Sequence, residues 1–152
     1  MEAPETSLHF GWLIPATVLL AVLGATINDL VEALISGFTH LGKLYAFSHI
    51  DNDKLYLLDL TAGPFMVAFS EELVFRKMAS SWLREAGYST LQIVLISAWF
   101  FSIAHWGRGF GTMLSALLMG CLFMVVYLKI GRLWPPVAAH WIIDFQAFGP
   151  GY

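Results

Sequence analysis

The stretch Ser70-Glu71-Glu72-Leu73-Val74-Phe75-Arg76 places two adjacent carboxylates and an arginine inside apolar sequence. Mostly hydrophobic residues flank it at 65–69 and 78–83, so the charged cluster lies well within a helix rather than at a solvated end. A charged side chain at the centre of a bilayer costs about 2.5 to 3.5 kcal/mol on insertion scales. A membrane helix that carries such a cluster therefore needs mutual pairing, a wet cavity or a function, and we take function as the working hypothesis.

Helical spacing accounts for part of this cluster. Glu72 and Arg76 are four residues apart, which places them on one helix face where they can pair. Glu71 points about a third of a turn away and has no such neighbour in the local sequence. Glu71 is therefore the residue whose burial most needs a functional explanation.

The composition predicts an integral membrane protein. Of the 152 residues, 58% are hydrophobic and 12% are charged, against roughly 25% charged residues in an ordinary soluble domain. We expect an all-α, polytopic bundle of about five to six transmembrane helices that forms a single membrane domain over residues 1–152. The net charge of -3 and the absence of a Lys/Arg cluster exclude nucleic acid, so partners are sought in the lipid bilayer.

Apolar runs and turn residues divide the chain into expected segments. Residues 1–54 would hold a first span over 8–27, an amphipathic helix over 28–46 and a polar loop from residue 48. The amphipathic helix is expected at the interface, with an additional span as the alternative. A long helix is expected over 55–83 with a break or helix start at Gly63-Pro64, followed by helices over 89–106, 112–128 and 133–148.

Basic residues give the expected topology a slight bias. One side would carry Lys77, Arg84, Lys129 and Arg132, and the other Lys43, Lys54 and Arg108. This bias favours a cytoplasmic amino terminus, with the 107–111 turn and the carboxyl terminus outside. If residues 28–46 cross the membrane, the assignment of the amino terminus reverses.

Two further helices contribute ionisable groups to the hydrophobic interior. His105 ends one helix, with Phe101 one turn before it, while His140 and Asp144 share a face of the last helix. We expect these groups to converge with Glu71 on one interior site, which could activate water by general-base catalysis or through a bound divalent metal. A lone histidine is more often structural, but the whole set across three helices favours function.

Together these residues resemble the CPBP family of intramembrane glutamate-type proteases, which includes the type II CAAX prenyl endopeptidases and the proteins once called abortive-infection proteins. The family patterns are EExxxR, FxxxH and HxxxN or HxxxD. They occur here in order as Glu71-Glu72-x-x-x-Arg76, Phe101-x-x-x-His105 and His140-x-x-x-Asp144. The similarity covers residues 63–148, the expected catalytic core, and residues 1–54 carry no family signature.

The resemblance implies an intramembrane endopeptidase that hydrolyses a peptide bond of a membrane-anchored or lipidated protein near its carboxyl terminus. It implies that Glu71 is the general base and that His105 helps it to hold the attacking water. His140 and Asp144 would stabilise the oxyanion. Glu72, Arg76 and Phe101 would support the site or bind substrate, with Glu72 and Arg76 forming an ion pair that positions Glu71 and Arg76 alternatively holding a substrate carboxylate.

Asp144 leaves the mechanism open, because an ionised carboxylate cannot donate a hydrogen bond to an oxyanion. Asp144 would be protonated, would orient His140, or would be a metal ligand. The third option makes Glu71, His105, His140 and Asp144 a candidate shell for zinc or another divalent metal. We favour a mechanism without a cofactor, because the glutamates lack the His-Glu-x-x-His spacing of zinc helices.

Two other functions compete with proteolysis. One is a non-catalytic binding or immunity protein that uses the same fold to hold a hydrophobic peptide. The other is ion or proton transport through the buried carboxylates, which proton flux in liposomes would detect. The short chain suggests a bacterial protein of the inner (plasma) membrane that crosses it several times, and its oligomeric state is not determined by the sequence.

Overall fold

The computed structural model describes residues 10–35 and 50–148, and every regular element within those ranges is a helix. A 3-10 turn, Phe10–Trp12, leads into α1. The expected all-α class is therefore confirmed. The elements are α1 (Leu13–Ile35), α2 (Asp53–Glu72), a π-helical turn η3 (Leu73–Met78), α3 (Ala79–Glu85), α4 (Thr90–Ala104), α5 (Phe110–Ile130) and α6 (Trp134–Phe148).

α1 is longer than the sequence predicted. Residues 28–35 continue α1, so the expectation that a separate amphipathic helix begins at Asn28 is wrong. No glycine or proline interrupts this stretch, and Asp29 and Glu32 lie on the exposed side, so their charges require no new helix. The remainder of that expected helix, residues 36–46, and residues 48–49 of the expected loop lie outside the described residues.

α2, η3 and α3 form one uninterrupted rod, and the break expected at Gly63-Pro64 does not occur. Pro64 lacks the N–H that would bond to the carbonyl four residues earlier. Close to that point, Trp141 Nε1 of α6 donates a hydrogen bond of 3.1 Å to Thr61 O, which supports the backbone around the proline. This contact joins the first half of the rod to the helix that carries His140.

Local sequence sets the helix ends that define the rest of the bundle. Ser89 and Gln92 form a capping box at the start of α4, and Ser89 is the residue at which the sequence predicted this helix to begin. Gly131 ends α5 in the left-handed conformation, with φ of 69°, which glycine adopts without steric cost. Asn52 caps α2 through its side-chain oxygen, which accepts from two backbone amides.

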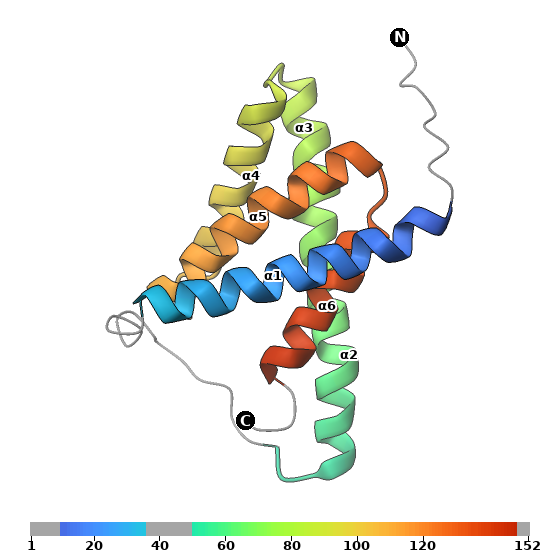
Figure 1. Cartoon of the computed structure of the whole chain (residues 1–152), viewed down its shortest axis with the longest axis vertical. Helices are drawn as coiled ribbons and strands as arrows, with labels where there is room; N and C mark the ends of the chain where they lie inside the picture. The colour runs from blue at the N-terminus through green and yellow to red at the C-terminus, as the bar shows by residue number, and fades with distance from the viewer. Residues whose placement is uncertain (1–9, 36–49, 149–152) are drawn as a thin grey trace.

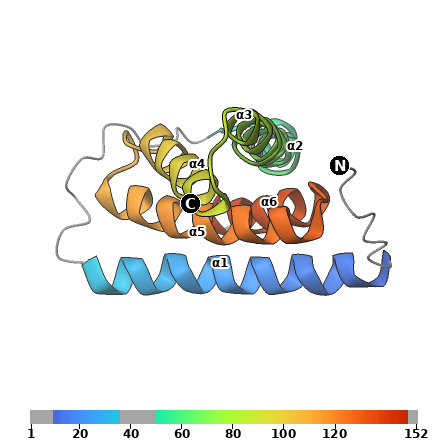
Figure 2. The same ribbon diagram turned by 90° about the horizontal axis from the view of Figure 1, so that it is seen from above.

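The helices are arranged in three layers (Figures 1 and 2). α1 forms one outer layer, α5 and α6 lie in the middle, and α4 with the α2–α3 rod covers the opposite side (Figure 2). The main apolar core lies between α1, α5 and α6 and consists of Leu20, Ala21, Met119, Phe123, Ala139 and Ile143. α4 and α5 approach closely, since a Cβ on Gly120 would lie 3.0 Å from Ala98 Cα.

Apolar side chains cover much of the outer surface. Ile14, Leu34 and Met66 are each about 70% exposed (72%, 73% and 69%). α1 and α5, of 23 and 21 residues, are long and apolar enough to cross a bilayer, and 22% and 33% of the residues in their most apolar stretches are buried. These features indicate a membrane protein with two candidate spans among the described helices. α4 and α6 have only 15 residues each, so the number of spans, five to six in our expectation, stays a prediction.

Candidate active site

An ion pair at the end of α2 forms the centre of the buried polar cluster. Glu72 and Arg76 are both 0% exposed. Arg76 Nη2 donates to Glu72 Oε1 at 3.1 Å, and Arg76 Nε lies 2.8 Å from Glu72 Oε2. The second contact is off the hydrogen-bonding direction, so it is a close charge pair rather than a second hydrogen bond. The four-residue spacing of the sequence thus predicted a pair that the structure contains.

His140 connects this ion pair to the other carboxylates. Its Nδ1 lies 3.0 Å from Glu72 Oε1, so the ring donates Nδ1–H to the Glu72 carboxylate. Its Nε2 faces the other way, 3.7 Å from Glu71 Oε2 and 3.5 Å from Asp144 Oδ2. Glu72 therefore fixes the orientation of the imidazole and leaves Nε2 for chemistry.

Glu71 and Asp144 form the accessible edge of the cluster. The Glu71 side chain is 25% exposed and that of Asp144 14%, against 5% for His140. Glu71 Oε2 is buried and has no hydrogen-bond partner, although Glu72 next to it is paired. The Glu71 side chain is thus partly exposed, while its Oε2 atom is buried beside His140 and accepts no hydrogen bond.

His105 lies at the end of α4, across an aromatic ring from these groups. Its Nδ1 is 2.8 Å from Phe101 O, so Nδ1–H donates to that carbonyl and Nε2 is left as an acceptor. Its ring packs edge-on against Phe101 with centroids 4.7 Å apart. His105 is also within electrostatic range of Glu71 and Asp144. The structure thus brings together six of the seven predicted residues, Phe101 included, and places the seventh, His105, against the Phe101 ring.

Two buried phenylalanines hold the polar groups in place. Phe101 contacts both histidines, and the Arg76 guanidinium carbon lies 4.7 Å from its ring centroid. Phe123 of α5 packs against His140 at 6.2 Å and lies 5.8 Å from the same guanidinium. Phe123 could not be predicted as a site residue, because nothing in its local sequence separates it from the other apolar residues of α5.

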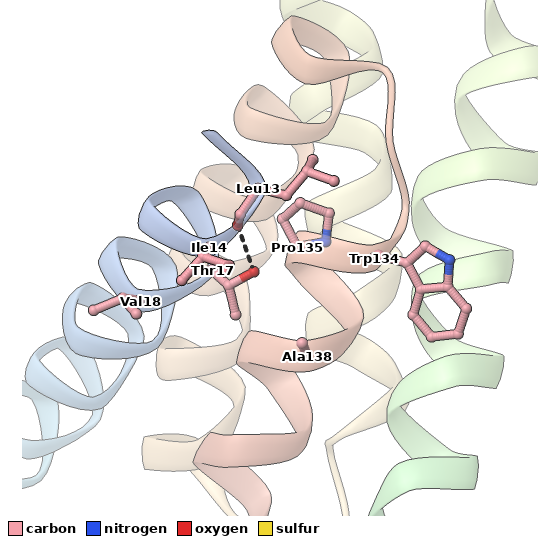
Figure 3. Close-up of a pocket in the computed structure, with 7 residues that line it drawn as sticks. All are labelled: Leu13, Ile14, Thr17, Val18, Trp134, Pro135 and Ala138. Carbon is pink, nitrogen blue, oxygen red and sulfur yellow. Dashed lines mark hydrogen bonds between the residues drawn. The ribbon is translucent and has the colours of Figure 1, made fainter. Parts of the chain in front are cut away.

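Two hollows on the surface lie apart from this cluster, in the groove between α1 and α6. The first, of about 280 Å³, is lined by Leu13, Ile14, Thr17, Val18, Trp134, Pro135 and Ala138 (Figure 3). The second, of about 390 Å³, is lined by Val18, Ala21, Val22, Ala25, Thr26, Asp29, Ile142 and Gln146. Neither is lined by a residue of the polar cluster.

The alternative metal shell of Glu71, His105, His140 and Asp144 can be compared with the geometry. Within residues 10–35 and 50–148, no three His, Cys, Asp or Glu side chains are arranged to hold one metal ion together. The Nδ1 atoms of both histidines are engaged, by Glu72 and by the Phe101 carbonyl. That the activity requires no metal therefore stays a prediction, to be tested by experiment.

A comparison with known protein families found a match, which covers all the residues of the polar cluster. Residues 53–146 match the Rce1-like family, described as type II CAAX prenyl endopeptidase Rce1-like. The chain belongs to this family. All three motifs lie within the matched residues, which begin ahead of the expected core at residue 63. Comparisons with curated proteins and with solved structures found no match. Membership in the Rce1-like family indicates a peptidase that acts on protein substrates.

Proposed function

We propose that this protein is an intramembrane endopeptidase of the CAAX-protease type, in a bacterial plasma membrane. It hydrolyses a peptide bond of a membrane-anchored or lipidated protein near the carboxyl terminus, with a water activated by glutamate. The observation that carries the proposal is a partly exposed Glu71 side chain whose buried Oε2 accepts no hydrogen bond and lies 3.7 Å from His140 Nε2, the atom that Asp144 also approaches. Family membership supplies the reaction class.

In the proposed mechanism, Glu71 takes a proton from water, and the water oxygen attacks the carbonyl carbon of the scissile bond. His105 Nε2 accepts the second hydrogen bond of that water, because its Nδ1–H is held by the Phe101 carbonyl. The C–N bond then breaks, and Glu71 returns its proton to the leaving amine. The products are a new carboxyl group and a new amino group, and the enzyme ends in its starting state.

The oxyanion of the tetrahedral intermediate would be stabilised by His140 and Asp144. As an imidazolium, His140 donates Nδ1–H to Glu72 and presents Nε2–H to the substrate. Asp144, 3.5 Å from Nε2, orients the ring or donates when protonated. One such donor is typically worth about 2.7 to 4 kcal/mol in the transition state. The full burial and pairing of Arg76 support a positioning role over capture of a substrate carboxylate.

The test compares Glu71→Gln with wild type on a quenched-fluorescent peptide that ends in a prenylated CAAX sequence and on a membrane-anchored reporter. Glutamine is nearly isosteric but cannot take the proton, so we expect kcat to fall by about 10³-fold at a matched membrane level, within the range known for acid–base catalysis and nucleophile activation. Lys77→Gln, an exposed charge change on the same rod, is the matched control and should retain activity.

Retained activity in folded Glu71→Gln would contradict the proposal. The polar cluster would then be architectural. The non-catalytic binding or immunity alternative would become the better account, and peptide binding without turnover would be the next measurement.

A further inference from the structure

The helix changes its geometry directly after the two glutamates. Residues Leu73–Met78 form a π-helical turn between α2 and α3. In an α-helix the Ala79 N–H would bond to Phe75 O, four residues earlier. Here it bonds to Val74 O and Arg76 O, so the Phe75 carbonyl loses that helical donor. Such turns are rare and occur often at functional sites.

A side chain from another helix bonds to this carbonyl. Ser97 of α4 is 2% exposed, and its Oγ donates a hydrogen bond to Phe75 O. The same helix supplies Phe101, whose ring packs edge-on against Phe75 with centroids 5.2 Å apart. α4 therefore holds the π-helical turn at two points, one polar and one aromatic.

We infer that Ser97 is a positioning residue for the peptidase site, whose hydroxyl maintains the π-helical turn that sets Glu72 against Arg76 and begins two residues after Glu71. This inference rests on the proposed function. Glu71 and Glu72 stand immediately before the turn, while Arg76 lies within it. A return to α-helical bonding would shift the hydrogen-bond register by one residue. The Arg76 side chain would then rotate about the helix axis relative to Glu71 and Glu72.

The consequence for the site follows from the contacts of Glu72. Its carboxylate pairs with Arg76 and also accepts the hydrogen bond from His140. A rotation within the turn would therefore disturb the orientation of the imidazole, although Ser97 does not touch it. We expect kcat to fall while substrate binding is preserved, because the His140 imidazole acts on the reacting atoms of the substrate.

The experiment compares Ser97→Ala with Ser102→Ala in lipid nanodiscs. Ser102 is a matched control on the same helix: it is 4% exposed, and its Oγ donates to Met113 O of α5 at 2.7 Å, away from the turn. Amide hydrogen exchange over residues 72–80 measures the turn directly and needs no enzymatic activity. We expect exchange there to accelerate about tenfold in Ser97→Ala and to stay unchanged in Ser102→Ala, since a tenfold change corresponds to a hydrogen bond of ordinary net strength.

The kinetic arm uses the same variants. Ser97→Ala should lower kcat about tenfold with KM within twofold of wild type, and Ser97→Thr, which keeps the hydroxyl, should restore part of kcat. Ser97→Cys, close to serine in size but a weak donor, replaces the alanine variant if that variant fails to fold.

The outcomes separate this inference from the proposed function. Unchanged exchange over 72–80 in the variants that lack the hydroxyl overturns the inference, whether or not the protein is a peptidase. Faster exchange with unchanged kcat also overturns it, because Ser97 would then be structural only. A wild-type protein without peptidase activity refutes the proposed function, while the exchange arm still decides whether Ser97 holds the turn.

Discussion

Glu71 and Glu72 are neighbours in the chain, yet their environments differ. Glu72 is fully buried between a guanidinium and an imidazole, whereas Glu71 is partly accessible and keeps a free oxygen. Consecutive helical residues point about 100° apart, so one side chain faces the ion pair and the other faces the edge. Glu72 therefore has a structural role in the ion pair, whereas Glu71 is available for chemistry.

This difference predicts opposite effects on stability. Glu72→Gln leaves Arg76 buried without its countercharge, so we expect the free energy of unfolding to fall by about 3–5 kcal/mol. Glu71→Gln removes no ion pair with Arg76 and should change it by less than about 1 kcal/mol. Thermal unfolding of the purified variants in one detergent measures both.

A second substitution checks the cause. Replacing both partners, in Glu72→Gln with Arg76→Met, should recover part of the lost stability, because no uncompensated charge is then buried. If the loss of unfolding free energy in the double variant equals the sum of the losses in the two single variants, Glu72 and Arg76 do not stabilise each other.

Asp144 stands at a position where the family pattern has asparagine or aspartate, so its role can be tested by substituting asparagine. An asparagine amide donates a hydrogen bond without needing to be protonated, so Asp144→Asn should stay within about tenfold of wild-type kcat. Asp144→Ala should lose about 10² to 10³-fold, as expected for loss of an oxyanion donor. Peptide cleavage at matched enzyme concentration gives both numbers.

The metal alternative predicts a different pattern for the same residue. If Asp144 is a metal ligand, the asparagine variant should be as inactive as the alanine variant. Activity would also be abolished by chelation and restored by zinc, and the purified protein would contain stoichiometric metal. We expect none of these results.

At the scale of the element, α5 has a role that its sequence did not indicate. It carries Phe123 to the polar cluster and approaches α4 through Gly120. Because α4 bears Phe101, Ser97 and His105, the contact between these two helices sets the distance across the site. Small residues at such contacts let membrane helices approach closely.

Gly120→Ala should therefore destabilise the protein. The new Cβ would lie 3.0 Å from backbone and side-chain carbon of Ala98, and neither atom can rotate away. We expect a loss of about 1–3 kcal/mol in unfolding free energy, typical of overpacking. Gly11→Ala is the control, because its Cβ would meet nothing within 4 Å. Equal melting temperatures for the two variants would contradict the close contact.

The elements also show which features a sequence can predict. The start of α4 at Ser89 and the Glu72–Arg76 pair depend on neighbours within four residues, and both were predicted. Near Pro64, α2 receives a hydrogen bond to Thr61 O from Trp141, which is distant in the chain. The π-helical turn likewise has its partner, Ser97, on another helix. Local patterns could not predict features that are stabilised by distant residues.

At the scale of the whole molecule, the site is assembled from two layers and supported by the third. Three motifs, recognisable in the sequence, come from the α2–η3 rod, α4 and α6. Phe123 and the core that holds it against α1 complete the assembly. Family motifs indicated which polar residues belong together, but apolar residues that support them look alike in sequence. The polar residues of the candidate site and Phe101, which belong to the motifs, were thus predictable, whereas Phe123 was not.

The arrangement of helix ends agrees with the charge bias of the loops. Leu83, near the end of α3, packs in one cluster with Leu128, near the end of α5, so the loops after these helices share one end of the bundle. Gly111, at the start of α5, lies against Ile35 at the opposite end. Arg84, Lys129 and Arg132 therefore lie toward one end, and Arg108 toward the other.

This separation predicts a topology that labelling can test. In a Cys121→Ser background, single cysteines at Tyr88 and Leu133 should react with a membrane-impermeant thiol reagent only from the cytoplasmic side, because basic loops are retained there. A cysteine at Trp106, which is 61% exposed, should react only from outside. Labelling of Tyr88→Cys and Trp106→Cys from the same side would mean that α4 does not cross the bilayer. If all three cysteines react from the side opposite to the expected one, the helix arrangement stands but the protein is inverted in the membrane. The accessible edge formed by Glu71 and Asp144 would then be open to proteins of the other compartment.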